Sequence, residues 1–186
     1  MGSQTVSKPS GTTRVVDGNI LKSRVTTVTE YDPHEMRGVI EHLRVEACGR
    51  TRLANLLMFR EWDPKTGQQT GRLRAMGLLD GNSIAEPRLQ MDAVPDAAKV
   101  LLVQAVRAQP KECPTSTALN TFRFGQTIVL KPPVDKAWTE LWPATVCGQP
   151  YAALMEFTPN PKGPGTQFKV SPFSLLNATA AATTKP

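Results

Sequence analysis

The sequence has few of the residues that build metal, redox and nucleophilic sites. Its 186 residues include two histidines, His34 and His42, and three cysteines, Cys48, Cys113 and Cys147. No Cys-x-x-Cys pair occurs, which excludes zinc ribbons and thioredoxin-type sites. The histidines lie eight residues apart and would not share a helix face. We therefore expect no metal site, and three reduced, buried thiols as in proteins that assemble inside cells.

Motifs for catalysis and cofactor binding are missing as well. The chain contains no Gly-x-Ser-x-Gly elbow, no phosphate-binding loop and no Gly-x-Gly-x-x-Gly after a strand. Cys48 follows His42 closely, but no third residue orients them. Glu61 and Asp63 lie beside a predicted turn, where acidic residues are commonly solvated. The sequence thus predicts a protein that is not an enzyme and holds no cofactor.

Long apolar segments are also missing. No run approaches the roughly 18 residues that a membrane-spanning helix needs. The opening residues, MGSQTVSKPSGTTR, include no apolar core of a secretory signal. We expect neither a membrane partner nor a secretory route.

Proline and glycine, by contrast, are abundant. The 16 prolines and 13 glycines make up about one residue in six, which indicates many short elements joined by turns. A hydrophobic fraction of 40% is enough for a packed core. We predict one β-rich domain over residues 14–173, between a flexible amino-terminal arm (1–13) and a flexible carboxy-terminal tail (174–186).

Alternating apolar residues and turn signals predict most of the strands. Asp17-Gly18-Asn19 predicts a hairpin turn. A second hairpin is predicted over residues 52–79, around Asp63-Pro64-Lys65-Thr66-Gly67. Further strands are expected at residues 22–31, 121–131, 150–158 and 166–173.

Three segments favour helices or stay ambiguous. Asp32-Pro33 can begin a helix, and apolar residues follow at helical spacing, so we prefer a helix over residues 33–47, with a strand as the alternative. Residues 99–107 fit either. A short helix is expected at residues 135–142, with Asp135 as its cap and Pro143 ending it. The predicted fold is mainly β: an antiparallel sandwich or barrel, jelly-roll-like in texture, with one to three short helices.

Basic residues concentrate between positions 37 and 74. Arginine predominates there, and its planar guanidinium suits phosphate and carboxylate groups. Aromatic residues on the predicted hairpin could stack on bases or pack at an interface. The candidate nucleic-acid or interface residues are Arg50, Arg52, Arg60, Trp62, Arg72 and Arg74.

Trp138 and Trp142 lie four residues apart, on one face of the predicted short helix. Such a pair is either a core plug or a subunit contact, and we select them as candidate contact residues.

Two functions fit these observations. The first is a non-enzymatic, self-assembling structural subunit, most simply a viral or phage coat protein located in the virion or host cytoplasm. Its partners would be copies of itself, with the nucleic-acid genome as a second candidate partner. The alternative is an RNA- or single-strand-binding protein on an OB-like barrel, which would use the hairpin at residues 52–79.

Overall fold

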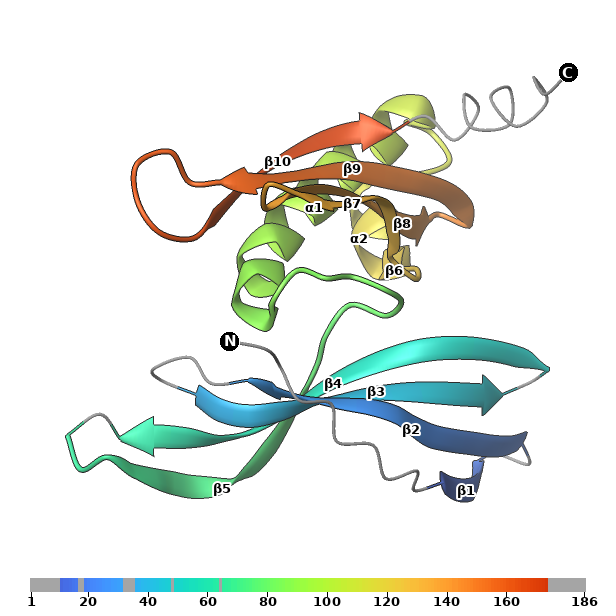
Figure 1. Ribbon diagram of the computed structural model, residues 1–186. Coiled ribbons are helices and arrows are strands. Elements are labelled where there is room, and N and C mark those ends of the chain that lie inside the picture. The colour runs from blue at the N-terminus through green and yellow to red at the C-terminus, as the bar shows by residue number, and fades with distance from the viewer. Residues whose placement is uncertain (1–10, 17–18, 32–35, 48, 64, 174–186) are drawn as a thin grey trace, which may run out of the picture. The chain divides into compact units, whose positions relative to one another are not determined.

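The computed structural model describes residues 11–16, 19–31, 36–47, 49–63 and 65–173 (Figure 1). The chain divides into two compact units, residues 1–81 and 82–186. The single domain expected over residues 14–173 stays a prediction. Residues 11–13 of the expected arm belong to the first strand. The rest of that arm and the expected tail lie outside the described residues.

The amino-terminal unit contains one antiparallel sheet in which sequence neighbours pair in the order β1-β2-β3-β4-β5 (Figure 1). The two predicted hairpins are confirmed, because β1 pairs with β2 and β4 pairs with β5. The strand predicted at residues 22–31 lies within β2. The strands are β1 (Gly11–Val16), β2 (Asn19–Tyr31), β3 (Met36–Ala47), β4 (Arg50–Asp63) and β5 (Gln68–Gly77).

The preferred helix over residues 33–47 is wrong, and the strand alternative is correct from Met36 onward. β3 pairs with β4 without a break, from Met36 opposite Glu61 to Ala47 opposite Arg50. This register needs a glycine at position 38, since a Cβ there would collide with the Met58 carbonyl oxygen. The residue that weakens a helix therefore permits close approach of two strands.

The turn between β4 and β5 confirms the predicted turn chemistry. Gly67 has a φ of 66°, and its N–H donates to the Asp63 carbonyl oxygen at 2.9 Å. The Asp63 carboxylate accepts a hydrogen bond from the Lys65 N–H at 2.8 Å. This bond, followed by one from the Thr66 hydroxyl, lowers the pKa of Asp63 below its ordinary value of 3.8.

The carboxy-terminal unit combines a second antiparallel sheet with two helices. Its strand order is β10-β9-β8-β6, and β7 also pairs with β8. The mainly β, antiparallel prediction is confirmed, and neither sheet closes into a barrel over the described residues. The elements are α1 (Pro87–Ala108), α2 (Thr115–Thr121), β6 (Arg123–Phe124), β7 (Ile128–Val134), β8 (Ala137–Val146), β9 (Gln149–Pro159) and β10 (Thr166–Phe173).

The predictions for this unit have mixed outcomes. The strands at residues 150–158 and 166–173 are confirmed as β9 and β10. The segment at residues 121–131 is a strand only in part, because it holds the short β6 and the start of β7. Residues 99–107, which fitted either element, are helical within α1.

The helix expected at residues 135–142 is wrong, because β8 begins at Ala137. Asp135 and Lys136 have φ values of 50° and 62° and form a two-residue turn, with Val134 opposite Ala137. Two successive positive φ values are typical of a tight hairpin turn. The aspartate that resembled a helix cap is therefore a turn residue.

The core of this unit lies between α1 and its sheet. Apolar α1 residues recur every four positions and are buried against β8, β9 and β10. Three of the five are alanines, which let the helix backbone lie close to the sheet. The buried α1 residues are Leu89, Ala93, Ala97, Leu101 and Ala105, and the largest sheet residues opposite are Trp142, Met155 and Phe157.

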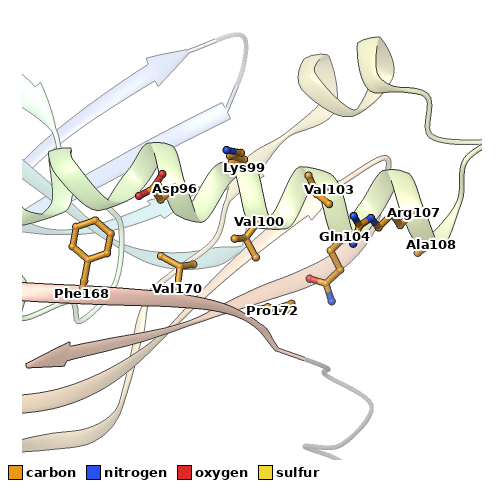
Figure 2. A pocket seen from close by; sticks show the side chains of 10 residues that line it. All are labelled: Asp96, Lys99, Val100, Val103, Gln104, Arg107, Ala108, Phe168, Val170 and Pro172. Carbon is orange, nitrogen blue, oxygen red and sulfur yellow. The ribbon is translucent and has the colours of Figure 1, made fainter.

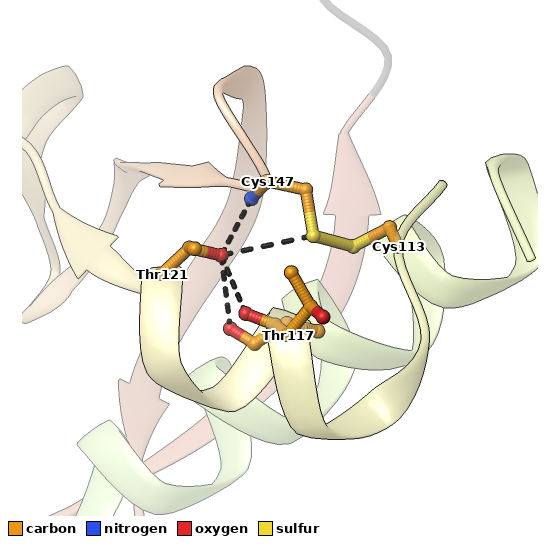
Figure 3. Close-up of a disulfide and its surroundings, with 5 residues drawn as sticks. Cys113, Thr117, Thr121 and Cys147 are labelled. Carbon is orange, nitrogen blue, oxygen red and sulfur yellow. Dashed lines mark hydrogen bonds between the residues drawn. A yellow bond between two sulfur atoms is a disulfide. The ribbon is translucent and has the colours of Figure 1, made fainter. Parts of the chain in front are cut away.

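The expectation of three reduced cysteines is wrong for two of them. Cys113 and Cys147 form a disulfide with their Cα atoms 5.8 Å apart (Figure 3). Cys113 follows α1, and Cys147 lies in the turn between β8 and β9. The Thr121 hydroxyl accepts a hydrogen bond from the Cys147 N–H at 2.8 Å and donates to the Thr117 carbonyl oxygen at 2.8 Å. Cys48 lies outside the described residues.

Candidate functional site

The register of β4 divides the predicted arginine cluster between two sheet faces. Arg50, Arg52 and Arg60 occupy even positions of a strand that pairs regularly with β3, so they share one face. Arg74 pairs with Phe59, an odd position, and lies on the opposite face. Trp62 belongs to β4 and Arg72 to β5, but the placement of their side chains is not described. The four arginines with described side chains therefore do not form one continuous patch.

Two of these arginines contact groups of their own unit. An Arg52 guanidinium nitrogen lies 2.9 Å from an Asp80 carboxylate oxygen, and an Arg60 nitrogen donates to the Gly71 carbonyl oxygen at 3.3 Å. A guanidinium has five N–H donors, so one such contact leaves others for a partner. Both side chains remain exposed.

Apolar side chains gather between these arginines, on the same face of β3 and β4. Val39 lies opposite Met58, and Leu43 lies opposite Ala54. Every member is half-buried, and none reaches full burial. We call this set the apolar sheet face; it consists of Val39, Leu43, Val45, Ala54, Leu56 and Met58.

One carboxylate lies within this apolar set. Glu41 is opposite Leu56 in the β3–β4 register and shares its face. The apolar sheet face thus has an acidic group near its middle and exposed arginines at both ends: Arg50 and Arg52 at one, Arg60 at the other.

The opposite face of the same sheet holds the fully buried Leu57 and a structural polar network. Asn55 is 4% exposed, and its Oδ1 lies 2.7 Å from His42 Nδ1. The Asn55 amide nitrogen donates to the carbonyl oxygens of Leu79 at 2.7 Å and Gly81 at 3.1 Å. This network holds the segment after β5 against β4. The sequence carries no signal for it, since His42 and Asn55 meet only through the strand register.

The two candidate contact tryptophans flank a buried carboxylate in the carboxy-terminal unit. Glu140 is fully buried and accepts hydrogen bonds from Trp138 Nε1 at 2.9 Å and Trp142 Nε1 at 2.8 Å. It also accepts one from the Ile84 N–H at 2.9 Å. Trp138 stacks on Phe157 with ring centroids 4.6 Å apart.

These contacts account for both indoles without a partner chain. Trp142 is fully buried in the core and Trp138 is half-buried. Their role as subunit contacts stays a prediction. Sequence reasoning missed Glu140, whose signal was an acid between two tryptophans at alternating positions of a strand.

Within the described part of the chain, no group of three or more His, Cys, Asp or Glu residues could hold a metal ion. The helices of that part are too short or too polar to cross a membrane. No protein-family model, curated protein or solved structure matches this chain. We select the apolar sheet face, with its arginine ends, as the candidate site on its own geometry.

Proposed function

We propose that this protein is a non-enzymatic, self-assembling structural subunit whose copies associate through the apolar sheet face. The observation that carries the proposal is the incomplete burial of six apolar side chains on one face of β3 and β4. A single sheet layer needs a partner over its apolar face to exclude water from it. A second copy supplies such a partner.

The composition of the face supports a protein–protein contact. Stable interfaces combine an apolar, well-packed centre with a polar rim, and arginine is enriched in them. Here apolar residues occupy the middle of two long strands, while Arg50, Arg52 and Arg60 lie at the ends. The predicted interface role of these three arginines fits this arrangement better than a continuous phosphate-binding track does.

The charges make the face self-complementary. In a two-fold contact the same patch of each copy meets its counterpart, so residue i of one copy faces residue j of the other and the reverse. Glu41 lies between the arginine-bearing ends. When two copies are offset along the strands, the Glu41 carboxylate of each copy reaches a guanidinium of the other.

A viral or phage coat protein is the class of assembly that we propose. The supporting observations are the strand-and-turn texture, the two antiparallel sheets and the arginine-flanked apolar face. In such particles copies of one chain are the principal partners, and the genome is a further one. The competing proposal, a single-strand nucleic-acid-binding protein, is separated by the experiment below.

The test compares the mass of the wild type with that of two lysine variants by light scattering over a range of concentrations. Leu56→Lys places a charge in the apolar sheet face. Thr51→Lys adds the same charge at an exposed position on the other face of the same strand. We expect an oligomeric wild type and an oligomeric Thr51→Lys variant. Leu56→Lys should associate at least 100-fold more weakly, a loss of about 2.7 kcal/mol in the free energy of association.

Two outcomes would reject the proposal. One is a wild type with a mass near 20.3 kDa at every concentration. The other is a folded Leu56→Lys variant, by circular dichroism, that associates as strongly as the wild type. A monomeric wild type that binds a labelled oligothymidylate with strong salt dependence would favour the nucleic-acid-binding alternative.

A further inference from the structure

A groove of about 790 Å³ runs between α1 and β10 in the carboxy-terminal unit (Figure 2). Phe168, Val170 and Pro172 line it from β10, at alternate positions of the strand. Val100 and Val103 line it from α1, and Val103 is 42% exposed. The groove therefore has an apolar lining supplied by one strand and one helix.

The strand that borders the groove lies at the edge of its sheet. β10 pairs with β9 and is the last strand in the order β10-β9-β8-β6. An edge strand presents N–H and C=O groups that a further strand can bind. Proline is tolerated in a sheet where its nitrogen points away from the paired strand. Residues two apart on a strand direct their N–H and C=O groups to the same side. Phe168 and Val170 therefore point these groups away from β9, as Pro172 does.

A buried acceptor lies in the same groove. Gln104 projects from α1 toward Pro172 (Figure 2), and its Oε1 is buried without a hydrogen-bond partner among the described residues. An unsatisfied buried carbonyl oxygen costs on the order of 1–3 kcal/mol. A ligand that brings an N–H donor into the groove would remove this cost.

The charged residues of the groove are unevenly distributed. Asp96 lies toward the Phe168 end of the groove, whereas Arg107 lies at the other end, beyond Gln104 (Figure 2). Lys99 adds a second positive charge on α1. Two cations against one anion favour a ligand with an acidic side chain, which would lie closest to Arg107.

We propose that this groove binds an extended peptide segment of a partner protein by addition of a strand to the free edge of β10. The segment carries apolar side chains at alternate positions and an acidic residue beside Arg107. Its backbone pairs with Phe168 and Val170, and one of its N–H groups donates to Gln104 Oε1.

The spacing of the groove residues fits a strand better than a helix. In an extended segment, side chains two residues apart are about 6.5–7 Å apart and face the same way. Phe168, Val170 and Pro172 have that same spacing, so the side chains of an added strand would match the spacing of these three residues. Strand addition at a sheet edge is a general mode of peptide recognition, in which pockets read alternate side chains. Pro172 limits the pairing to a short stretch, because it offers no N–H donor.

The test selects 12-residue peptides from a random phage-displayed library on the full-length protein. The best peptide is then synthesised and its affinity measured by fluorescence anisotropy. We expect a consensus of apolar residues at alternate positions with an aspartate or glutamate. Val103→Lys should weaken binding at least tenfold. The matched control Ile128→Lys changes another exposed apolar residue of this unit, which is 48% exposed and does not line the groove, and should leave binding unchanged.

Amide hydrogen exchange distinguishes strand addition from other binding. The amides of Phe168 and Val170 should exchange at least tenfold more slowly in the complex. Each of these results would overturn the proposal: no enriched consensus, binding that survives Val103→Lys, a consensus with helical spacing, or a complex without protection of these two amides. Protection already present in the unliganded protein would also overturn it. If that protection is independent of concentration it shows an occupant from the same chain, and if it grows with concentration it shows a second copy.

Discussion

Replacement of Glu140 by glutamine should destabilise the carboxy-terminal unit more than any change of an exposed charge in it. The Glu140 carboxylate is fully buried and accepts three N–H groups, from Trp138, Trp142 and Ile84. It thereby joins β8 to the segment before α1. Its removal affects two tryptophans and one backbone amide together.

The expected magnitude follows from the division of donors between the two oxygens. Oε1 accepts from Trp138 Nε1 and the Ile84 N–H, while Oε2 accepts from Trp142 Nε1. In Glu140→Gln one oxygen becomes an NH₂ group, so at least one buried donor then faces another donor. An unsatisfied buried donor costs about 1–3 kcal/mol, and the remaining bonds lose their charge assistance. We expect a loss of about 2–4 kcal/mol in the free energy of unfolding.

The assay is urea denaturation followed by tryptophan fluorescence, because two of the three tryptophans flank this carboxylate. The control is Glu156→Gln. That carboxylate pairs with Lys169 at 3.5 Å on the surface, and its loss should cost less than about 1 kcal/mol. A Glu140→Gln variant within about 0.5 kcal/mol of the wild type would contradict this prediction, since the three hydrogen bonds, one buried and two part-buried, cannot then depend on the carboxylate.

Two further changes test the strand register and the disulfide. Gly38→Ala should lower the free energy of unfolding by about 1–3 kcal/mol, measured by thermal melting, because the added methyl group meets the Met58 carbonyl oxygen. The control Gly77→Ala, with open space around its Cβ, should have little effect. Equal effects of the two substitutions would contradict the β3–β4 register. Reduction of the Cys113–Cys147 disulfide should cost roughly 3–4 kcal/mol, since it opens a loop with a sequence separation of 34. Peptide mapping of unreduced protein should recover the two cysteines in one linked species, and their recovery as separate thiols would contradict the structure.

Elements with a single consistent signal were predictable from the sequence. In residues 167–172 polar and apolar residue types alternate, with Phe168, Val170 and Pro172 as the apolar ones, and this segment lies in β10. The hairpin around Asp63 and Gly67 combines turn residues with flanking strands, and it was predicted for the physical reason that the structure shows.

The two wrong helices arose from spacings that fit both periods. A separation of four residues keeps side chains on one face of a helix and also of a strand, because four is an even number. Leu43 lies four residues after Val39, and Trp142 four after Trp138. In each segment an aspartate resembled a helix cap, and Asp135 instead lies in a tight turn.

The candidate site could be predicted only in part. Residue type identified the arginines of β4 and β5 as interface candidates. The sheet face on which each side chain lies, however, depends on strand pairing and on bulges. Arg74 lies opposite Phe59, an odd position of β4, and so lies on the face away from Arg52. The disulfide could not be predicted because sequence separation does not reveal that the turn at Cys147 lies beside Cys113.

A photo-crosslinking experiment tests the central claim, that copies associate through the apolar sheet face. Leu56 is replaced by a benzophenone-bearing phenylalanine, and the variant is mixed with isotope-labelled wild type before irradiation. We expect mixed-isotope crosslinked dimers whose labelled peptide comes from β3 or β4. Crosslinks confined to one chain, or dimers linked only through the carboxy-terminal unit, would contradict it.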